Sequence, residues 1–402
     1  MSKITKVVAR QIFDSRGNPT VEAEVFVKKI SSSAICPSGA STGSFEAHEK
    51  RDKNRKDYNG KSVFNAVKVI NKIIAKKLKN KSVHDQEKID HILLQLDGTK
   101  QKTKLGANSM LAVSMAVKKL SSKIKKIPLY KNFIVKNNFS LPYPLMNIIN
   151  GGVHANNGLQ IQEFMIRPDG ARSFTKAVKM CFLVITNLRK ILEKMKLSTS
   201  VGDEGGFAPM ISNNNQALLL ITKAIKMSKL VNGKDVSICL DVAANELKEG
   251  KTIEYYEKLI KKYPIKSIED PFSEDDWTSW TKLSRLVDIQ IVGDDLFATN
   301  PKRLEKGIKE KSANAILVKL NQIGTITETL KVIKIAQNSG LKTIISHRSG
   351  DSEDTFIADF AVATNSSQIK AGSLARSERV SKYNRLLRIE EELGNSIKMA
   401  KI

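Results

Sequence analysis

Short apolar runs recur at a regular interval in the second half of the chain. Six of them lie between residues 237 and 370, and each ends in a charged or ionisable side chain. Successive ends are about 25 residues apart, and segments with helical periodicity fill most of the gaps. Repeated strand–helix units of this length form a parallel sheet. Six units in succession without a reversal favour a (β/α) barrel over an open sheet.

Three of the gaps carry specific helix signals. Apolar residues share one face in 277–286 and again in 326–333. Gly340 is placed to end the second of these helices. Ser352, followed by two acidic residues, predicts the N-terminal cap of a third helix.

The first part of the chain follows a different pattern. Period-2 alternation predicts two strands, at 7–13 and 20–27, joined by a turn. Helical periodicity predicts helices over the ranges 61–80, 85–96 and 106–121, and a helix is also expected from near Phe45. Prolines 128, 142 and 144 punctuate the stretch that follows, which places a domain boundary near 130–140.

The residues that end the six apolar runs predict the position of an active site. In a barrel, the carboxyl ends of the strands open on one mouth, and the active site lies there. The six end residues are therefore expected to face one cavity: Asp241, Glu269, Asp294, Lys319, His347 and Lys370. The alternative is that they are ordinary polar residues that reach solvent at strand ends.

The chemical types of these residues indicate a metal-assisted acid–base reaction. Three carboxylates suit a hard divalent cation such as Mg²⁺, although Mn²⁺ and Ca²⁺ accept the same ligands. The alternative is that the carboxylates pair with the lysines. A cation together with Lys370 is expected to lower the pKa of Lys319 and leave a neutral amine, a suitable base for a proton next to a carboxylate. Arg348 and Ser349 are candidates to bind a phosphate group.

Two loops supply further candidates. The segment 201–209 places Glu204 in a glycine-rich turn, where it can approach a ligand and serve as a general acid, or be part of an ordinary turn. The segment 38–43 is short and rich in hydroxyl groups, and it suits either a lid or a plain connection.

Charge and composition exclude several classes of protein. The net charge of +26 admits nucleic-acid binding, but the lysines alternate with apolar residues at helical spacing, as on the solvated faces of amphipathic helices. The three cysteines lie far apart, which argues against a disulfide framework or a structural zinc site. No apolar run has the length of a membrane helix, and the N-terminus lacks a signal-peptide core.

Several motifs resemble those of the enolase family, and the resemblance covers nearly the whole chain. They occupy the ranges 14–22, 38–43, 150–154, 162–165, 202–206, 318–325, 346–350, 375–379 and 382–391. The resemblance implies an N-terminal α+β domain over 1–134, with a mobile loop at 38–43. It implies a C-terminal (β/α)8-type barrel over 140–402 whose first strands break the regular alternation. Family members are usually cytoplasmic homodimers.

The resemblance also implies a reaction and a role for each candidate. It implies a glycolytic lyase, Mg²⁺-dependent, that dehydrates 2-phosphoglycerate to phosphoenolpyruvate. Lys319 would be the base and Glu204 the acid. The first Mg²⁺ would be bound by Asp241, Glu269 and Asp294, and a second by Ser41. The substrate would be bound by His154, Gln162, Glu163, His347, Arg348, Ser349 and Lys370.

Two other functions remain open from the sequence. Bacterial enolases can associate with RNA-processing assemblies or lie at cell surfaces, and a charge of +26 suits RNA. Another lyase of the enolase superfamily, acting on a different acid, is a further possibility. The expected phosphate site at 346–349 and the loop that carries Ser41 argue against that second function.

Overall fold

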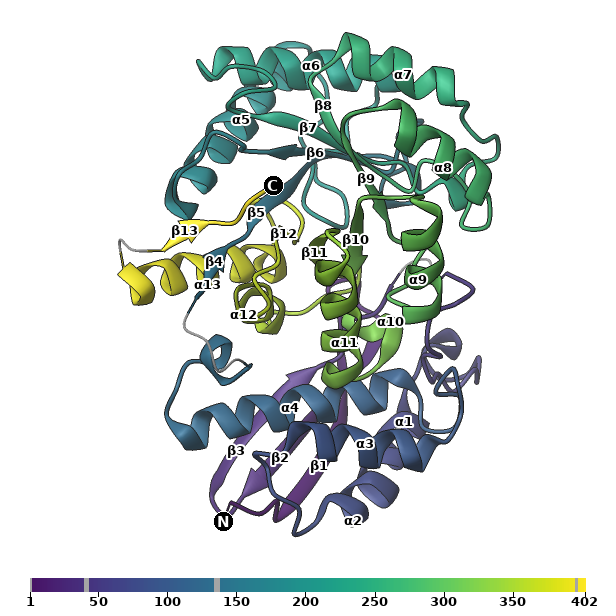
Figure 1. Cartoon of the computed structure of the whole chain (residues 1–402), viewed down its shortest axis with the longest axis vertical. Helices are drawn as coiled ribbons and strands as arrows, with labels where there is room; N and C mark the ends of the chain where they lie inside the picture. The colour runs from purple at the N-terminus through teal and green to yellow at the C-terminus, as the bar shows by residue number, and fades with distance from the viewer. Residues whose placement is uncertain (1, 40–42, 134–137, 395–396) are drawn as a thin grey trace.

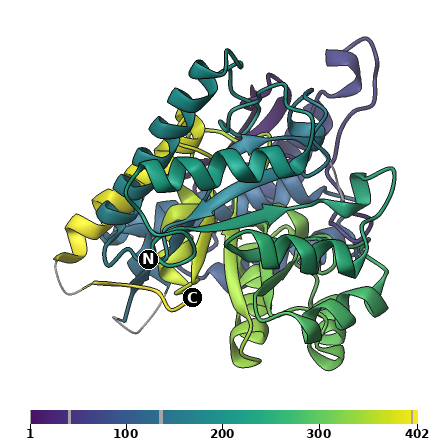
Figure 2. The same ribbon diagram turned by 90° about the horizontal axis from the view of Figure 1, so that it is seen from above.

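The computed structural model describes residues 2–39, 43–133, 138–394 and 397–402. Figure 1 shows an N-terminal domain at one end and a barrel at the other, and Figure 2, the view from above, places the purple N-terminal elements behind the barrel. Among the described residues, no helix is long and apolar enough to cross a membrane.

The N-terminal domain is a three-stranded antiparallel sheet covered by helices. The strands pair in chain order: β1 (Lys6–Phe13), β2 (Pro19–Val27) and β3 (Ile30–Ile35). The helices are α1 (Phe64–Val69), which continues through a π-helical segment (Ile70–Ile74) into α2 (Ala75–Leu78), then α3 (Gln86–Asp97) and α4 (Ala107–Lys125). Helix α4 lies on β2 and β3, and most of its residues are buried. The two predicted strands and three predicted helical ranges are confirmed, and β3 was missed.

One N-terminal expectation is wrong. No helix begins near Phe45, because residues 44–46 form a turn and the chain stays irregular until a short 3-10 turn, Tyr58–Gly60. The pattern misled because Phe45 packs against Arg303 of the barrel, 3.9 Å from ring centre to guanidinium carbon, and not against a helical neighbour.

The second domain is a closed eight-stranded barrel. Around the ring, each strand pairs with its neighbours in the order β10, β11, β12, β5, β6, β7, β8, β9. Strand β6 is antiparallel to β5 and β7, and the other pairs are parallel. The bounds are β5 (Tyr143–Asn150), β6 (Glu163–Arg167), β7 (Ser237–Asp241), β8 (Ile265–Glu269), β9 (Gln290–Gly293), β10 (Ala315–Val318), β11 (Lys342–Ser346) and β12 (Gln368–Lys370).

The barrel confirms the expected fold, including its irregular start. The six predicted runs are β7 to β12, and the irregular first strands are β5 and the antiparallel β6. The inside of the ring is filled by apolar side chains from seven of its positions: Leu145, Met165, Cys239, Val292, Ala315, Leu317 and Ile344. The inside of the ring is therefore a packed core, and a cavity lies beyond the carboxyl ends of its strands.

Helices surround the barrel. They are α5 (Phe174–Lys194), α6 (Asn214–Met227), α7 (Ile253–Lys262), α8 (Trp277–Leu286), α9 (Pro301–Glu310), α10 (Leu320–Ile323), α11 (Ile326–Asn338), α12 (Phe356–Ala363) and α13 (Ser377–Leu393). Gly340, with φ of 80°, follows the end of α11 as predicted. Ser352 is not a cap: α12 begins at Phe356 after Thr355, and the Ser352 hydroxyl accepts the backbone N–H of Asp354.

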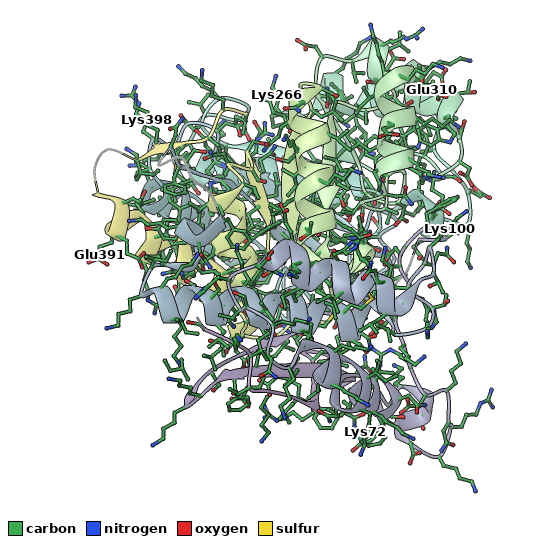
Figure 3. The ribbon with its side chains drawn as sticks, turned by 60° about the horizontal axis from the view of Figure 1, so that its bottom comes forward. Lys72, Lys100, Lys266, Glu310, Glu391 and Lys398 are labelled. Carbon is green, nitrogen blue, oxygen red and sulfur yellow. The ribbon has the colours of Figure 1, made fainter. Side chains whose placement is uncertain are left out.

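Short pairings tie the remaining segments to these two domains. Strand β4 (Ser140–Leu141) pairs with β13 (Lys398–Met399), and 3-10 turns occupy Leu129–Phe133, Gly152–His154 and Ala244–Glu246. The positive charge is spread over both domains: the labelled Lys72, Lys100, Lys266 and Lys398 stand on separate edges of the molecule in Figure 3.

Candidate active site

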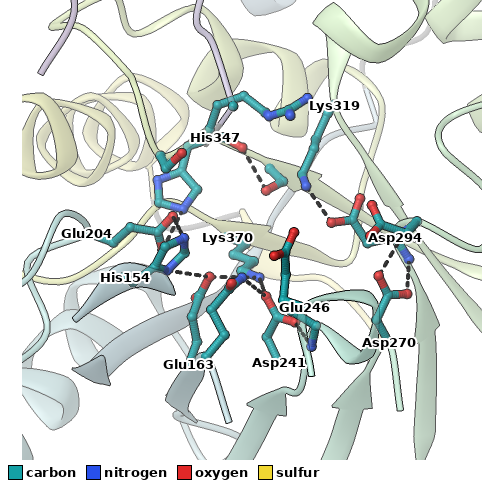
Figure 4. A pocket seen from close by; sticks show the side chains of 17 residues that line it. His154, Glu163, Glu204, Asp241, Glu246, Asp270, Asp294, Lys319, His347 and Lys370 are labelled. Carbon is teal, nitrogen blue, oxygen red and sulfur yellow. Dashed lines mark hydrogen bonds and ion pairs between the residues drawn. The ribbon is translucent and has the colours of Figure 1, made fainter. Parts of the chain in front are cut away.

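The strand ends of the barrel meet at one cavity, which the N-terminal domain reaches at Gly39. Asp241, Asp294, Lys319, His347 and Lys370 line the cavity (Figure 4), and the carboxylate of Glu269 is bonded to Lys370 beside it. Each follows or ends a successive strand from β7 to β12. The lining also includes His154, Gln162, Glu163, Glu204, Arg348 and Ser349. Ser41 lies outside the described residues.

Lys370 is the centre of a buried charge cluster. Its Nζ lies 2.8 Å from Asp241, 2.9 Å from Glu269 and 3.2 Å from Glu163. Burial opposes protonation, but the three carboxylates outweigh it and raise the pKa of Lys370 well above its ordinary value. The pairing of carboxylates with lysines, left open by the sequence, is therefore present.

The carboxylates in this cluster are short of positive charge. Burial, followed by repulsion from Asp241, raises the pKa of Glu269 well above its usual range. Burial, followed by repulsion from Glu204, does the same to the pKa of Glu163. One oxygen of each, Oε2, is buried and accepts no hydrogen bond from the described residues. Orphaned carboxylate oxygens at a strand-end mouth are the donor set that a divalent cation satisfies.

Lys319 is paired with Asp294 by a short hydrogen bond, and Gln322 donates to the other oxygen of Asp294 at 3.1 Å. Burial lowers the pKa of Lys319, but attraction by Asp294 reverses this and raises the pKa above its ordinary value. Without a cation, the side chains of the protein therefore raise the pKa of Lys319. The sequence expectation was a lowered pKa, and it assumed a bound divalent cation.

A second acidic group beside Asp294 was missed from the sequence. Oxygens of Asp270, Asp294 and Asp295 lie within 4.8 Å of one another. Asp270 accepts the backbone N–H groups of Asp294 and Asp295 at 2.9 and 2.8 Å, which fixes the turn after β9. Burial and repulsion by Asp294 raise the pKa of Asp295 to about 7. The signal was present as two acidic pairs at strand ends, 269–270 and 294–295.

Glu204 lies between two histidines on the other side of the cavity (Figure 4). His347 Nε2 is 3.3 Å from its Oε2, and His154 Nε2 is 3.8 Å from its Oε1. Burial opposes ionisation of Glu204, but His347 and His154 stabilise the carboxylate and hold its pKa well below the usual range. The next residue, Gly205, has φ of 84°, and a Cβ there would lie 2.6 Å from the carbonyl oxygen of Ala375. Glycine is therefore required to turn Glu204 into the cavity.

Arg348 is oriented by a residue from the N-terminal domain. Its Nη1 donates to Glu46 at 2.9 Å and to Asn321 at 3.1 Å, and its Nη2 donates to the second oxygen of Glu46 at 3.3 Å. Ser349 follows in the same turn and also lines the cavity. Sequence reasoning missed Glu46, which is 302 positions from Arg348 and has no distinctive local pattern.

The two-domain fold and this carboxylate–lysine cavity define a barrel enzyme equipped for general acid–base chemistry on an acidic substrate. Comparison with known proteins agrees: residues 4–133 match the N-terminal domain of enolase, and residues 138–401 match its C-terminal TIM barrel domain. The chain is 66% identical to an enolase of Pelagibacter ubique (strain HTCC1062) over 417 aligned positions that span both proteins completely.

The chain belongs to the enolase family. Its activity is that of enolase, the dehydration of 2-phosphoglycerate to phosphoenolpyruvate in glycolysis, and the family uses Mg²⁺.

Proposed function

We propose that Lys319 and Glu204 share this dehydration as base and acid. Lys319 takes the proton from carbon 2, and the electron pair moves into the substrate carboxylate to give an enediolate. The pair then returns to form the double bond between carbons 2 and 3. The bond from carbon 3 to its hydroxyl breaks, and the proton of Glu204 converts the leaving hydroxide to water. The observation that carries this division is that the two groups face one cavity from opposite sides.

The proposed roles require a protonated Glu204 and a neutral Lys319. The two histidines hold the pKa of Glu204 low in the protein alone, and the negative charge of a bound phosphate and carboxylate raises that pKa toward the protonated form. Lys319 needs the opposite change. A cation held by Asp294 would weaken the pairing with Lys319, which is what raises the pKa of that amine in the protein alone.

We assign the substrate groups from the cationic and polar side chains of the cavity. Arg348 and Ser349 bind the phosphate, which replaces Glu46 as the acceptor of the guanidinium. Lys370 supports the carboxylate end of the substrate. The remaining neighbours position the substrate and complete the shell: His154, Gln162, Glu163 and His347.

The donor set fits Mg²⁺. Asp241, Glu269 and Asp294 would hold the first ion, and the orphaned oxygen of Glu269 supports this assignment. Ser41 is proposed for a second ion on the strength of the family motif at 38–43. When bound, Mg²⁺ supplies positive charge that stabilises the doubly charged carboxylate of the intermediate.

A coupled assay with two variants tests the proposal. Enolase activity should vanish on chelation and return with Mg²⁺. Lys319→Ala should abolish exchange of the carbon-2 proton with solvent. Glu204→Gln should abolish dehydration while exchange continues. Retained exchange in the first variant, or equal loss of both activities in the second, would refute the assigned roles.

We further propose the cell context and assembly that the family resemblance implies. The domain 1–134 caps the barrel 140–402, the protein is a homodimer, and it works in the cytoplasm. RNA-processing or cell-surface partners remain secondary, because the lysines alternate with apolar residues at helical spacing, as on solvated helix faces. Sedimentation analysis tests the dimer, and a salt-dependent RNA affinity would support the RNA role.

A further inference from the structure

Arg379 is a fully buried arginine that the proposed chemistry does not use. It lies in the first turn of α13 with no exposed surface. Its Nη1 lies 2.6 Å from Nδ1 of His347 and 2.7 Å from the carbonyl oxygen of Arg348. Its Nη2 donates to the carbonyl oxygen of Ser349 at 2.6 Å. These contacts place one permanent cation directly behind His347 and behind Arg348 and Ser349, the two residues proposed to bind the phosphate, here called the phosphate turn.

The contact with His347 has only one possible direction. A guanidinium has no acceptor and stays protonated in proteins, so Nη1 donates. Its two hydrogens point to the two acceptors just described, His347 Nδ1 and the carbonyl of Arg348. Nδ1 must therefore offer a lone pair, and the ring proton is on Nε2.

A second proton on His347 is disfavoured. Burial lowers the pKa of His347 to about 4; Arg379 lowers it as well, while Glu204 and Asp351 oppose the shift. Among the residues that the structure describes, these three charged groups shift the pKa of the ring most. Asp351 is itself paired with Lys382 at 2.9 Å, so it offers the imidazole little net negative charge. The ring is therefore neutral near pH 7.

The tautomer has a consequence for Glu204. Nε2 of His347, which carries the ring proton, lies 3.3 Å from Oε2 of Glu204 without the alignment of a hydrogen bond, and Nδ2 of Asn147 donates to the same oxygen at 3.4 Å. Oε1 has His154 Nε2 at 3.8 Å, beyond hydrogen-bond length. Oε2 thus accepts the hydrogen bond of Asn147 and faces the hydrogen on His347 Nε2, whereas Oε1 has no donor within hydrogen-bond length among the described residues. A proton on Glu204 is therefore better accommodated on Oε1.

We propose that Arg379 is a positioning residue that fixes His347 as the Nε2–H tautomer, and that the proton delivered by Glu204 is carried on Oε1. The inference rests on the proposed role of Glu204 as the acid. Arg379 thereby connects the phosphate turn to the acid: the guanidinium that holds the carbonyl oxygens of Arg348 and Ser349 also orients the histidine that selects the reactive oxygen.

The direct test is the tautomer of His347 in the wild-type protein. The protein is labelled with ¹⁵N at its five histidines, and a long-range ¹H–¹⁵N spectrum is recorded near pH 7. The resonances of His347 are assigned by their loss in His347→Gln. The expected result is an unprotonated Nδ1 and a protonated Nε2. A hydrogen on Nδ1 overturns the proposal, and this measurement needs no variant of Arg379 to fold.

Kinetics separate this positioning role from a structural one. Arg379→Met should mix the tautomers and lower kcat for dehydration by about 100-fold, the scale of one acid–base contribution, with carbon-2 exchange within about threefold of wild type. Arg379→Lys, which keeps a cationic donor, should recover part of the loss. A merely structural role instead lowers both activities equally, and that result overturns the proposal.

Arg385→Met is the matched control. Arg385 lies on the same helix but pairs with Asp359 and Glu392, away from His347, so tautomer and activity ratio should stay unchanged. Glu204→Gln separates a failure of the acid assignment from a failure of the tautomer assignment. If that variant still dehydrates substrate, the assignment of the acid fails. If it does not, and Nδ1 of His347 carries the hydrogen, only the tautomer inference fails.

Discussion

At the scale of single residues, Lys370 compensates the charge of several buried carboxylates, which the local sequence around it does not indicate. Three carboxylates from β6, β7 and β8 share its one ammonium group. Removing one partner of a buried ion pair leaves an uncompensated charge, which costs far more than the net value of the pair. Lys370 is thus a structural group of the barrel as well as a proposed substrate ligand.

Lys370→Met should lower the free energy of unfolding by about 3 kcal/mol in the presence of a chelator. Added Mg²⁺ should recover much of this loss, because a cation held by Asp241 and Glu269 supplies the missing positive charge. Urea denaturation with and without Mg²⁺ measures both values. Lys72→Met, at an exposed position, is the control and should change neither. A loss that Mg²⁺ leaves untouched would contradict the proposed metal ligands.

The glycine after Glu204 carries a second prediction. Gly205→Ala should cost about 2 kcal/mol or more, because it combines a positive φ with a Cβ placed 2.6 Å from the carbonyl oxygen of Ala375. Gly17→Ala is the matched control, since Gly17 has φ of 72° and open space around it; it should cost only the backbone strain of about 1 kcal/mol. Chemical denaturation compares the two variants, and equal costs would show that the close approach does not matter.

At the scale of elements, the first turn of α11 is capped from the other domain. Asp90 of α3 accepts the backbone N–H of Thr327 at 2.9 Å, and Ser114 of α4 accepts that of Ile326 at 3.2 Å. Lys102 adds an ion pair to Glu328 at 2.7 Å. Helix α11 follows the segment that carries Lys319, so the N-terminal domain secures the barrel element next to the proposed base.

Asp90→Ala should destabilise the protein by about 2 kcal/mol, because it leaves buried donors without an acceptor. Asp85→Ala is the matched control: Asp85 caps α3 within its own domain by accepting the N–H of Lys88, and its loss should cost about 1 kcal/mol. Urea denaturation measures both. If Asp90→Ala costs no more than the control, the cap between domains contributes nothing of its own.

Elements with a clear local period were predictable from the sequence. Strands β7 to β12 are short apolar runs between amphipathic helices, and their charged ends predicted the position of the cavity. Strand β5 was not predicted, because all eight of its residues are buried and it contains Pro144. It therefore shows neither polar–apolar alternation nor an uninterrupted apolar run. The helix expected near Phe45 failed because Phe45 packs against Arg303 of the barrel. The cap expected at Ser352 failed because its hydroxyl accepts the N–H of Asp354 and the helix begins only at Phe356.

The site residues that stand at strand ends were predictable from the sequence. Those that act through contacts with residues far away in the chain were not. Lys319 and the three carboxylates stand at strand ends, which the period located. Glu46, Asn147 and Arg379 act through contacts with residues up to 302 positions away. No spacing rule reports such contacts, and the motif at 375–379 marked Arg379 without indicating what it touches.

At the scale of the whole molecule, the charge of +26 is spread over both domains. Mutual repulsion of exposed lysines opposes the compact state, and salt screens it. The thermal midpoint should therefore rise between about 10 mM and 150 mM KCl, with screening over about 10 Å at 0.1 M. Calorimetry at both concentrations measures the shift. A falling midpoint would mean that surface ion pairs, and not repulsion, dominate.

The closure of the barrel sets the order in which the protein can be completed during synthesis. The ring is sealed where Tyr143, Pro144 and Leu145 of β5 pair with Gln368, Ile369 and Lys370 of β12. Until the ribosome has released residue 370, the nascent barrel has an open edge on β5 that other chains can pair with. The last strand also delivers the ammonium group that neutralises the carboxylates of β6, β7 and β8. Nascent chains stalled before that point should therefore be inactive and prone to aggregate.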